Sequence, residues 1–525
     1  MSLQVDLSHI DATAFCSLPA RLQEIAKRQP HRPAILFEGN EISWGQLARH
    51  ARLIAGGLAN LGLKPGERVA ILSRNCGEYS EIFMGVVSGG YCAVTLPTMA
   101  SAETLGVLLG DCRPAAIFIS KEYEELAASV LQVANLKPAL ISIGGGVFSC
   151  AELMAQSSEN YQPPKIEPQR EFNTVYSSGT TSTPKGIVHS HLTRAVMSKG
   201  LAGLNFDRSS ITLISTPLYT NLSLPAFFAT LWAGGAALIM PKFDAAQFLR
   251  LASSHRASHF FLVPVQVQRL LADPAFATTD LSATKLKYVA GSRFDPALKK
   301  AAIDQWPGAL FEVYGMTEGA PLSSFVVNDH PEKIESVGRP AVGSVIKIIG
   351  DDGKELGVNT PGEIVGRSGA MMMGYNNRPD ATKELIWSDV DGSIFFRSGD
   401  IGKLDEDGFL YVLDRKKDMI ISGGLNIYAS DIEAVIADHP IVAEVAVVAV
   451  PSKEWGESPF ACVVANSGVP QVEAAELLQW INDRVAKYQR LAGLKYYDTL
   501  PRNALGKVLK KELRMEIVAK AGTVS

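Results

Sequence analysis

Strand-like runs of apolar residues alternate with segments of helical periodicity over much of the chain, and this alternation most constrains the fold. Residues 68–73 read as a strand, 79–88 as a helix and 91–96 as a second strand. Similar strand-like runs recur at residues 115–119, 211–215, 236–240, 259–263 and 287–290. Such alternation is typical of α/β proteins with mostly parallel sheets. We therefore predict an α/β fold whose large N-terminal domain contains mostly parallel sheets.

Residues 345–415 show a different pattern, in which short strand-like runs are separated by glycine and aspartate turns. These runs are 346–349, 363–367, 394–397 and 409–413. They predict a small β-barrel or an antiparallel sheet. After Lys417 the pattern is mixed, with helices at 430–438 and 472–487 and strands at 442–450, 460–465 and 495–497. Because 525 residues are too many for one core, we expect a smaller α+β C-terminal domain.

Charge and composition exclude several classes of protein. The net charge of -4 argues against a nucleic-acid binder, whose binding face would be basic. The six cysteines have no C-x-x-C spacing, and His189 and His191 have no evident third ligand, so neither disulfides nor a zinc site are expected. The sequence contains no secretory signal and no apolar run of about 18 residues. We expect a cytoplasmic monomer or homodimer with no integral membrane segment and no nucleic-acid partner.

A segment rich in hydroxyls, with glycines and a lysine, follows the strand-like run 172–176. Phosphate oxygens accept hydrogen bonds from backbone N–H groups, hydroxyls and ammonium groups, and glycine lets a backbone approach a polyanion. We predict a loop that binds nucleotide phosphates through Ser177, Ser178, Gly179, Thr180, Thr181, Ser182 and Lys185. The order of Lys185 and Gly186 does not fit a Walker A loop. A serine- and threonine-rich surface loop is the alternative.

Four further motifs follow in order: Tyr314-Gly315-Met316-Thr317-Glu318, Arg397-Ser398-Gly399-Asp400, Asp414-Arg415-Lys416-Lys417-Asp418 and Gly506-Lys507. Together with the loop, they closely resemble the ordered motifs of the adenylate-forming enzymes, the superfamily of acyl-CoA synthetases, peptide-synthetase adenylation domains and luciferases. The resemblance covers about residues 18–513. It implies that a carboxylate attacks the α-phosphate of ATP, that pyrophosphate leaves, and that a thiol converts the acyl-adenylate into a thioester.

For the first step, the resemblance implies Lys507, Thr317 and Glu318 as catalytic residues. Lys507 would place its ammonium between the carboxylate and the α-phosphate, and Glu318 would be the carboxylate that binds Mg²⁺. The nucleotide would also contact Gly291, Ser292, Tyr314, Gly315, Asp400 and Arg415. Asp400 would hold the ribose, although it can also cap a turn, and Lys507 can be a surface lysine. Ser182 departs from the family, in which glycine is usual.

For the second step, the resemblance implies contacts with coenzyme A by Gly423, Gly424, Trp455, Tyr488 and Arg490. The two glycines would line a narrow tunnel or form a simple turn, and Trp455 would stack on the nucleotide or lie in the core. The turn 414–417 is expected to be a hinge with Lys417 as pivot, although a solvated hairpin turn fits as well. It would join an N-terminal ATP- and acid-binding domain at 1–413 to a mobile C-terminal lid domain at 418–525.

The sequence gives fewer signals for the acyl pocket. The resemblance implies that mostly neutral residues line it. These are Tyr219, Thr220, Val263, Ala290, Gly291, Gly315 and Pro321. A neutral pocket favours an aromatic, alicyclic or medium-chain acid over a dicarboxylate or an amino acid, because an additional charge would need a buried partner.

We therefore predict an ATP-dependent carboxylate–CoA ligase of the AMP-forming acid–thiol type, which uses ATP, Mg²⁺, coenzyme A and a small carboxylic acid. Two alternatives stay open. One is an adenylating enzyme that loads the phosphopantetheine of a carrier protein. The other is a non-catalytic binding protein with the same fold, against which the joint presence of Glu318, Asp400 and Lys507 argues.

Overall fold

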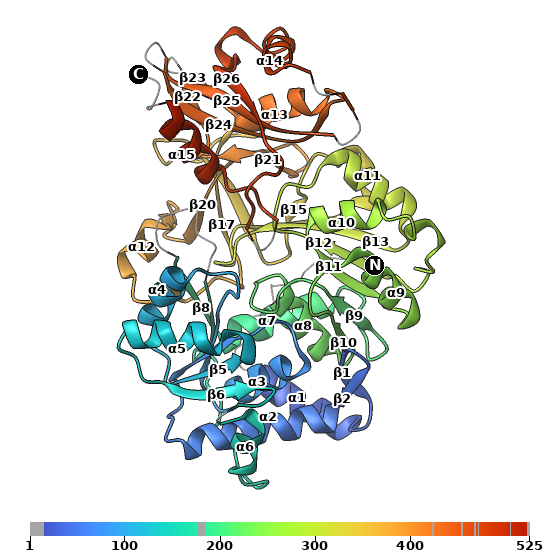
Figure 1. Cartoon of the computed structure of the whole chain (residues 1–525), viewed down its shortest axis with the longest axis vertical. Helices are drawn as coiled ribbons and strands as arrows, with labels where there is room; N and C mark the ends of the chain where they lie inside the picture. Colours follow the sequence, from blue (N-terminus) through green and yellow to red (C-terminus); the bar gives the residue numbers. More distant parts are fainter. Residues whose placement is uncertain are drawn as a thin grey trace. The chain divides into compact units, whose positions relative to one another are not determined.

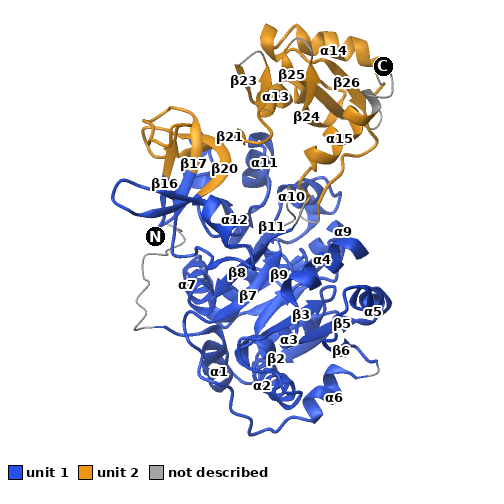
Figure 2. Ribbon diagram, turned by 90° about the vertical axis from the view of Figure 1, so that its left-hand side faces the viewer, with its two compact units in different colours: residues 1–346, 365–396 blue, residues 347–364, 397–525 orange. Residues whose placement is uncertain are grey.

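The computed structural model describes residues 15–146, 148–176, 184–422, 425–452, 455–466, 469–470, 472–503 and 506–521. The chain divides into two compact units (Figure 2). The first contains residues up to 346 and 365–396, and the second contains 347–364 and residues from 397 onward. Lys417 lies within the second unit, and the hinge and domain boundary at residues 414–417 stay a prediction.

Two large sheets form the first unit (Figure 1). The nine-stranded sheet has the order β15 (Arg339–Pro340), β14 (Leu322–Val326), β13 (Ala309–Gly315), β12 (Leu286–Val289), β11 (His259–Leu262), β9 (Ile211–Ile214), β10 (Ala236–Ile239), β1 (Pro33–Phe37) and β2 (Asn40–Ser43). The seven-stranded sheet has the order β18 (Gly374–Tyr375), β8 (Gly186–Ser190), β7 (Glu171–Tyr176), β4 (Cys92–Thr95), β3 (Arg68–Leu72), β5 (Ala116–Ser120) and β6 (Ala139–Ile143). Their inner strands pair in parallel, which confirms the predicted fold class.

Aromatic side chains join these two sheets through the helices α3 (Gly77–Ser88) and α8 (Ser223–Ala233). The ring centroid of Phe83 on α3 lies 5.6 Å from that of Phe172 on β7 and 5.3 Å from that of Phe228 on α8. The inner strands are buried on both faces, as parallel strands covered by helices must be. Other helices of this unit are α1 (Leu18–Arg28), α2 (Trp44–Asn60), α6 (Cys150–Ala155), α7 (His191–Ala202) and α12 (Pro379–Glu384).

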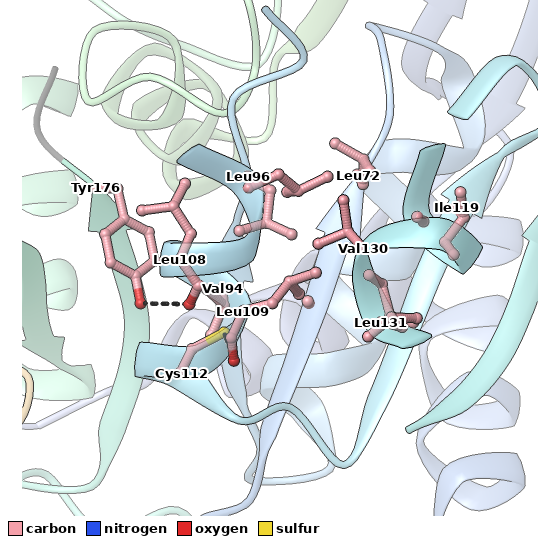
Figure 3. Close-up of a cluster of buried hydrophobic side chains, with 14 residues drawn as sticks. Leu72, Val94, Leu96, Leu108, Leu109, Cys112, Ile119, Val130, Leu131 and Tyr176 are labelled. Atoms are coloured by element: carbon pink, nitrogen blue, oxygen red, sulfur yellow. Dashed lines mark hydrogen bonds between the residues drawn. The ribbon is translucent and has the colours of Figure 1, made fainter. Parts of the chain in front are cut away.

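Each sheet also has an outer layer of helices. On the seven-stranded sheet, Leu108 and Leu109 of α4 (Ala102–Cys112) pack with Val130 and Leu131 of α5 (Glu124–Val133) over the strands (Figure 3). On the nine-stranded sheet the helices are α9 (Ala245–Ser254), α10 (Pro264–Leu271) and α11 (Pro296–Gln305). Both layers help to exclude water from the parallel strands.

The segment predicted as a small β-barrel or antiparallel sheet forms a sheet in the order β16 (Val345–Ile349), β17 (Gly362–Arg367), β20 (Ile394–Leu404) and β19 (Ile386–Ser388), with β21 (Leu410–Arg415) beside β20. The β19–β20 and β20–β21 pairs are antiparallel. In the β20–β21 pair Asp400 lies opposite Arg415.

The C-terminal part of the second unit is a five-stranded sheet with helices on both faces. Its order is β23 (Leu425–Ile427), β22 (Ile420–Ser422), β25 (Gly456–Ala465) and β24 (Val442–Ser452), with β26 (Gly493–Tyr496) beside β25. Residues of β24 alternate between the faces: Val447 packs under α13 (Ala429–Ala437) and α14 (Ala474–Asn482), and Val448 packs with α15 (Lys510–Ala521). No helix in the described ranges is long and apolar enough to cross a bilayer.

The predicted helix 472–487 is shorter in the structure, where α14 ends at Asn482. The Asn482 side chain accepts a hydrogen bond from the backbone N–H of Leu491 at 2.7 Å and donates to its carbonyl. These two bonds hold the following segment as a loop. Hydrophobic periodicity did not reveal this end, because a contact nine residues away determines it.

Candidate active site

The carboxyl ends of neighbouring parallel strands bring several predicted residues to one edge of the nine-stranded sheet. Leu262 at the end of β11 pairs with Val289 of β12, which pairs with Glu312 of β13. The residues at the ends of these strands and just after them therefore lie along the same edge, where open α/β sheets bind ligands. They include Val263, Ala290, Gly291, Tyr314 and Gly315 from the predicted acyl and nucleotide sites.

Gly291 and Val263, both predicted for the acyl pocket, lie close together at this edge. Gly291 has a φ of +99°, and a Cβ built on it would lie 3.4 Å from Val263 Cγ1. Val263 is buried, Ala290 is half-buried, and Gly291 and Ser292 are exposed. The two strand ends thus provide an apolar wall beside an open backbone segment.

Tyr219 and Thr220 are buried in the turn before α8. The Tyr219 carbonyl accepts a hydrogen bond from the Thr95 hydroxyl at 3.0 Å, and burial raises the pKa of its phenol. The Thr220 hydroxyl donates to the Pro217 carbonyl at 2.8 Å. This turn uses the Thr220 hydroxyl internally, whereas the neutral Tyr219 ring adds apolar surface.

Glu318 and Lys185, the predicted metal ligand and the predicted phosphate-loop lysine, contact the same tyrosine. The Tyr375 hydroxyl donates to Glu318 Oε1 at 2.7 Å, and Lys185 Nζ lies 4.8 Å from the centre of the Tyr375 ring. Burial and the Glu318 carboxylate raise the pKa of Tyr375 well above its usual range, so the hydroxyl remains a donor. Sequence reasoning missed Tyr375, because it lies far from both partners along the chain and has no local motif.

The turn that holds Thr317 and Glu318 is anchored by backbone contacts. The Met372 N–H donates to the Glu318 carbonyl at 2.8 Å, and Ser368 Oγ donates to the Gly319 carbonyl. Gly319 has a φ of +93°, and a Cβ on it would lie 1.9 Å from the Ala370 carbonyl oxygen. Only glycine fits this close approach without a shift of the backbone.

The residues that flank the predicted phosphate loop are hydrogen-bonded to Asp111, either directly or through Asn376. Tyr176 donates to Asp111 Oδ2 at 2.7 Å, and the Asn376 amide donates to the same oxygen at 2.9 Å. The Asn376 N–H also donates to the Gly186 carbonyl at 2.7 Å. The predicted contacts Ser177, Ser178, Gly179, Thr180, Thr181 and Ser182 lie outside the described residues.

In the second unit, the structure brings Lys507 together with Asp400 and Arg415. Arg415 Nε lies 3.1 Å from Asp400 Oδ1, and the Asp400 carboxylate is nearly buried. Burial and the charge of Arg415 lower the pKa of Lys507 to about 8, while the charge of Asp400 opposes this shift. The three residues therefore share one electrostatic environment, in which the ammonium of Lys507 is only partly compensated.

A short turn presents Lys507. Its N–H donates to the Asn503 side chain, its carbonyl accepts from the Asn503 N–H, and both distances are 2.9 Å. Gly506 has a φ of +77°, which glycine adopts readily. These two hydrogen bonds with Asn503 restrain the backbone of Lys507.

The predicted hinge is held at its border by backbone hydrogen bonds. The Lys416 N–H donates to the Gly399 carbonyl at 2.8 Å, and the Asp418 N–H donates to the Arg415 carbonyl at 2.9 Å. Lys417 itself is exposed, as a pivot residue can be. Its role as pivot stays a prediction.

Three of the predicted contacts with coenzyme A are exposed. Trp455 and Tyr488 expose 46% and 44% of their surface, and Arg490 is also exposed. Trp455 is therefore not a core residue. Ser422, the last described residue before Gly423, pairs with Gly456, which follows Trp455, whereas Gly423 and Gly424 lie outside the described residues.

The sequence and the fold are similar to those of known proteins. Residues 22–376 match the family model described as AMP-binding enzyme, and residues 431–507 match that of the AMP-binding enzyme C-terminal domain. A feruloyl-CoA synthase from Amycolatopsis sp is 31% identical over 495 residues, which is 93% of this chain and 96% of that protein. The fatty acid–[acyl-carrier-protein] ligase ScoC from Streptomyces coeruleorubidus is 30% identical over 500 residues, 93% of this chain and 94% of that protein. The crystal structure of ATP-bound MatB from Rhodopseudomonas palustris superposes with a TM-score of 0.87 at 28% identity and covers 95% of this chain and 98% of that one.

Proposed function

Because the chain belongs to the AMP-binding enzyme family, we propose that it is an ATP-dependent carboxylate–CoA ligase that releases AMP and pyrophosphate. The observation that carries this proposal is the shared environment of Lys507, Asp400 and Arg415. A carboxylate that can accept hydrogen bonds from ribose hydroxyls, beside a lysine with a lowered pKa that can lie near the α-phosphate, suits the 5′ side of a nucleotide. The family match at both ends of the chain supports the same conclusion.

In the first step, a carboxylate oxygen of the acid forms a bond with the α-phosphorus as the bond to the pyrophosphate oxygen breaks. Two anions meet in this displacement, so positioning and charge neutralisation dominate catalysis. We assign Lys507 to the charge that develops at the α-phosphate, and Asp400 to the ribose hydroxyls. Arg415 orients the Asp400 carboxylate through its 3.1 Å contact.

The residues around Glu318 fit a magnesium ion. The Tyr375 hydroxyl donates a hydrogen bond to Glu318 Oε1, and Glu318 Oε2 has no partner among the residues that the structure describes. Mg²⁺ binds proteins through one or two carboxylates and fills its other positions with phosphate oxygens and water, so one glutamate suffices. Within the described ranges, no group of three or more histidine, cysteine, aspartate or glutamate residues competes for a metal. When bound, the ion would neutralise charge on the departing pyrophosphate.

In the second step, the thiolate of coenzyme A attacks the acyl carbonyl, and AMP leaves with the pair of electrons of the broken bond. We assign Trp455, Tyr488 and Arg490 to the nucleotide end of coenzyme A, and Gly423 and Gly424 to its pantetheine arm. The exposure of Trp455 and Tyr488 supports a ligand-stacking role, since neither ring is used in the core. Rotation about Lys417 would exchange the residues used in the two steps.

We expect the substrate to be an aromatic, alicyclic or medium-chain carboxylic acid. Val263 and Tyr219 are neutral and buried, and Ala290 is apolar and half-buried. None of these three side chains carries a charge that could pair with a second carboxylate on the substrate. The feruloyl-CoA synthase found among the relatives acts on an acid of the first class.

A second candidate function is the loading of a carrier protein, which the similarity to the ligase ScoC favours. Incubation with ATP, an acid panel and either coenzyme A or a phosphopantetheinylated carrier protein separates the two functions. Mass spectrometry should detect free acyl-CoA in the first mixture. Acylated carrier protein without acyl-CoA would instead establish the second function, and no pyrophosphate release with any acid would exclude both.

The role of Lys507 has its own test. Lys507→Ala should abolish acid-dependent pyrophosphate exchange but retain thioester formation from supplied acyl-AMP. Lys511→Ala, which removes an exposed lysine four residues away, is the matched control and should retain both activities. Equal loss of both half-reactions in Lys507→Ala would contradict the assignment.

A further inference from the structure

Arg194 is a fully buried arginine in the first unit that has no carboxylate partner among the residues that the structure describes. It lies on α7, with 0% of its surface exposed. Its guanidinium donates to Asn173 Oδ1 and Asn221 Oδ1, each at 2.9 Å, and contacts His189 Nδ1 at 3.1 Å. Buried charges are normally paired with an opposite charge, because desolvation is expensive. A guanidinium held by neutral groups alone therefore calls for a functional explanation.

The contact with Arg194 determines the tautomer of His189. Arginine has only donors, so His189 Nδ1 must accept its hydrogen bond and the ring proton lies on Nε2. His189 Nε2 then donates to the Thr317 carbonyl at 2.8 Å. Burial and the nearby charge of Arg194 lower the pKa of His189 well below its usual value, which keeps the ring neutral with one donor and one acceptor.

This hydrogen bond reaches the peptide group that precedes Glu318. The carbonyl of Thr317 and the N–H of Glu318 belong to one planar peptide unit. The next peptide unit is held by the Met372 N–H, which donates to the Glu318 carbonyl at 2.8 Å. The two bonds restrain the backbone on both sides of Glu318, while Tyr375 restrains its side chain.

We propose that Arg194 and His189 are positioning residues for the ATP- and magnesium-binding turn, acting in sequence through the carbonyl of Thr317. Arg194 orients the His189 ring, and His189 fixes the peptide plane from which Glu318 projects. Both side chains are buried, and we assign neither a contact with substrate. This inference rests on the proposed function, because it assigns to the turn the binding of MgATP.

A purely structural role for these buried residues is the competing explanation. His259 on β11 provides the comparison, because it is equally buried, contacts Ser258 Oγ at 2.9 Å and contacts the Leu204 carbonyl at 3.3 Å. His259→Leu removes a buried histidine and its carbonyl contact without touching Thr317. It is therefore the matched control for His189→Leu.

The experiment compares the full-length wild-type protein with His189→Leu, His189→Gln, Arg194→Met and His259→Leu. Isothermal titration calorimetry with MgATP reports binding without catalysis, thermal unfolding reports stability, and pyrophosphate exchange over a range of Mg²⁺ concentrations reports the use of metal. We expect His189→Leu and Arg194→Met to weaken MgATP binding about tenfold, the effect of losing one orienting hydrogen bond. Both variants should also need more Mg²⁺ for half-maximal exchange.

His189→Gln should bind MgATP nearly as well as the wild type, because its amide offers both a donor and an acceptor. His259→Leu should lower the melting temperature but leave MgATP affinity unchanged. Wild-type affinity in His189→Leu, or equal losses of affinity in His189→Leu and His259→Leu, would overturn the positioning role. If His189→Leu does not fold, Arg194→Met and His189→Gln decide by the same criterion. Absence of MgATP binding by the wild type would refute the proposed function itself, and the positioning role with it.

Discussion

Lys507 and Asp400 lie far apart in the sequence but share one electrostatic environment in the second unit. Burial and the charge of Arg415 lower the pKa of Lys507 to about 8, and the Asp400 carboxylate limits this decrease. The predicted catalytic ammonium and the predicted ribose ligand are thus electrostatically coupled. Replacement of Asp400 should therefore alter the pH range in which the Lys507 side chain is charged.

The first prediction concerns the pH dependence of adenylation. The charged ammonium of Lys507 is the active form, and it is lost as the pH rises through the pKa of about 8. The value of kcat/KM for ATP should therefore decrease above about pH 8. In Asp400→Asn the opposing carboxylate is absent, so this decrease should begin at a lower pH. Pyrophosphate exchange measured from pH 6 to 10 provides both profiles.

Asp438→Asn is the control for this shift, because Asp438 is an exposed carboxylate of the same unit. Its profile should coincide with that of the wild type. If Asp400→Asn reduces activity by the same factor at every pH, the electrostatic coupling to Lys507 is wrong, although a ribose contact would still be allowed.

The second prediction concerns the hydrogen bond from Tyr375 to Glu318. Tyr375→Phe removes only the hydroxyl that donates to Glu318 Oε1 at 2.7 Å. A hydrogen bond to a charged group contributes about 1.5 kcal/mol. Its loss should therefore raise the Mg²⁺ concentration needed for half-maximal exchange about tenfold. Pyrophosphate exchange as a function of Mg²⁺ concentration measures this change.

Tyr91→Phe is the matched variant, since Tyr91 is also buried and its hydroxyl donates to the Leu63 carbonyl instead. Its Mg²⁺ dependence should equal that of the wild type. An unchanged Mg²⁺ requirement in Tyr375→Phe would remove Tyr375 from the metal site.

The third prediction concerns the stability of the Glu318 turn. Gly319→Ala should destabilise the protein by about 2–5 kcal/mol, because the new Cβ adds overpacking to a strained positive φ. Its Cβ would lie 1.9 Å from the Ala370 carbonyl oxygen. Thermal or denaturant unfolding measures the change.

Gly392→Ala separates the two causes, because Gly392 has a φ of +81° but has nothing within 4 Å of the position of a Cβ. This control should lose only about 1–2 kcal/mol, from backbone strain alone. Equal destabilisation of the two variants would mean that the turn relaxes around the added methyl group.

The fourth prediction concerns coenzyme A. Trp455→Ala should raise the KM for coenzyme A roughly three- to tenfold, as expected for the loss of one aromatic contact, while adenylation continues normally. Met515→Ala, which truncates another exposed apolar residue of the second unit, should leave this KM unchanged. A wild-type KM in Trp455→Ala would contradict a role of Trp455 in the binding of coenzyme A.

Gly424→Leu tests the predicted tunnel for the pantetheine arm. A leucine side chain should block a narrow passage, so thioester formation from acyl-AMP should decrease strongly while pyrophosphate exchange persists. Normal thioester formation in this variant would eliminate the tunnel assignment.

Local patterns predicted the regular elements well. The strand-like run 68–73 corresponds to β3, and the run 287–290 to β12, each within one or two residues. The positions of Asp400 and Lys507 followed from motifs in which neighbouring residues carry the signal. Such features depend on the period of the backbone and on the chemistry of adjacent side chains, and both are written in a short stretch of sequence.

Other features were decided by contacts between distant residues. No local signal predicted three of these features: the hydrogen bond from Tyr375 to Glu318, the buried contact between Arg194 and His189, and the end of α14 at Asn482. The sequence alone therefore determined the fold class and the family, and it predicted the chemical groups of the site. Only the tertiary structure decided which groups restrain one another, because hydrogen bonds and pKa shifts depend on distances that no local period encodes.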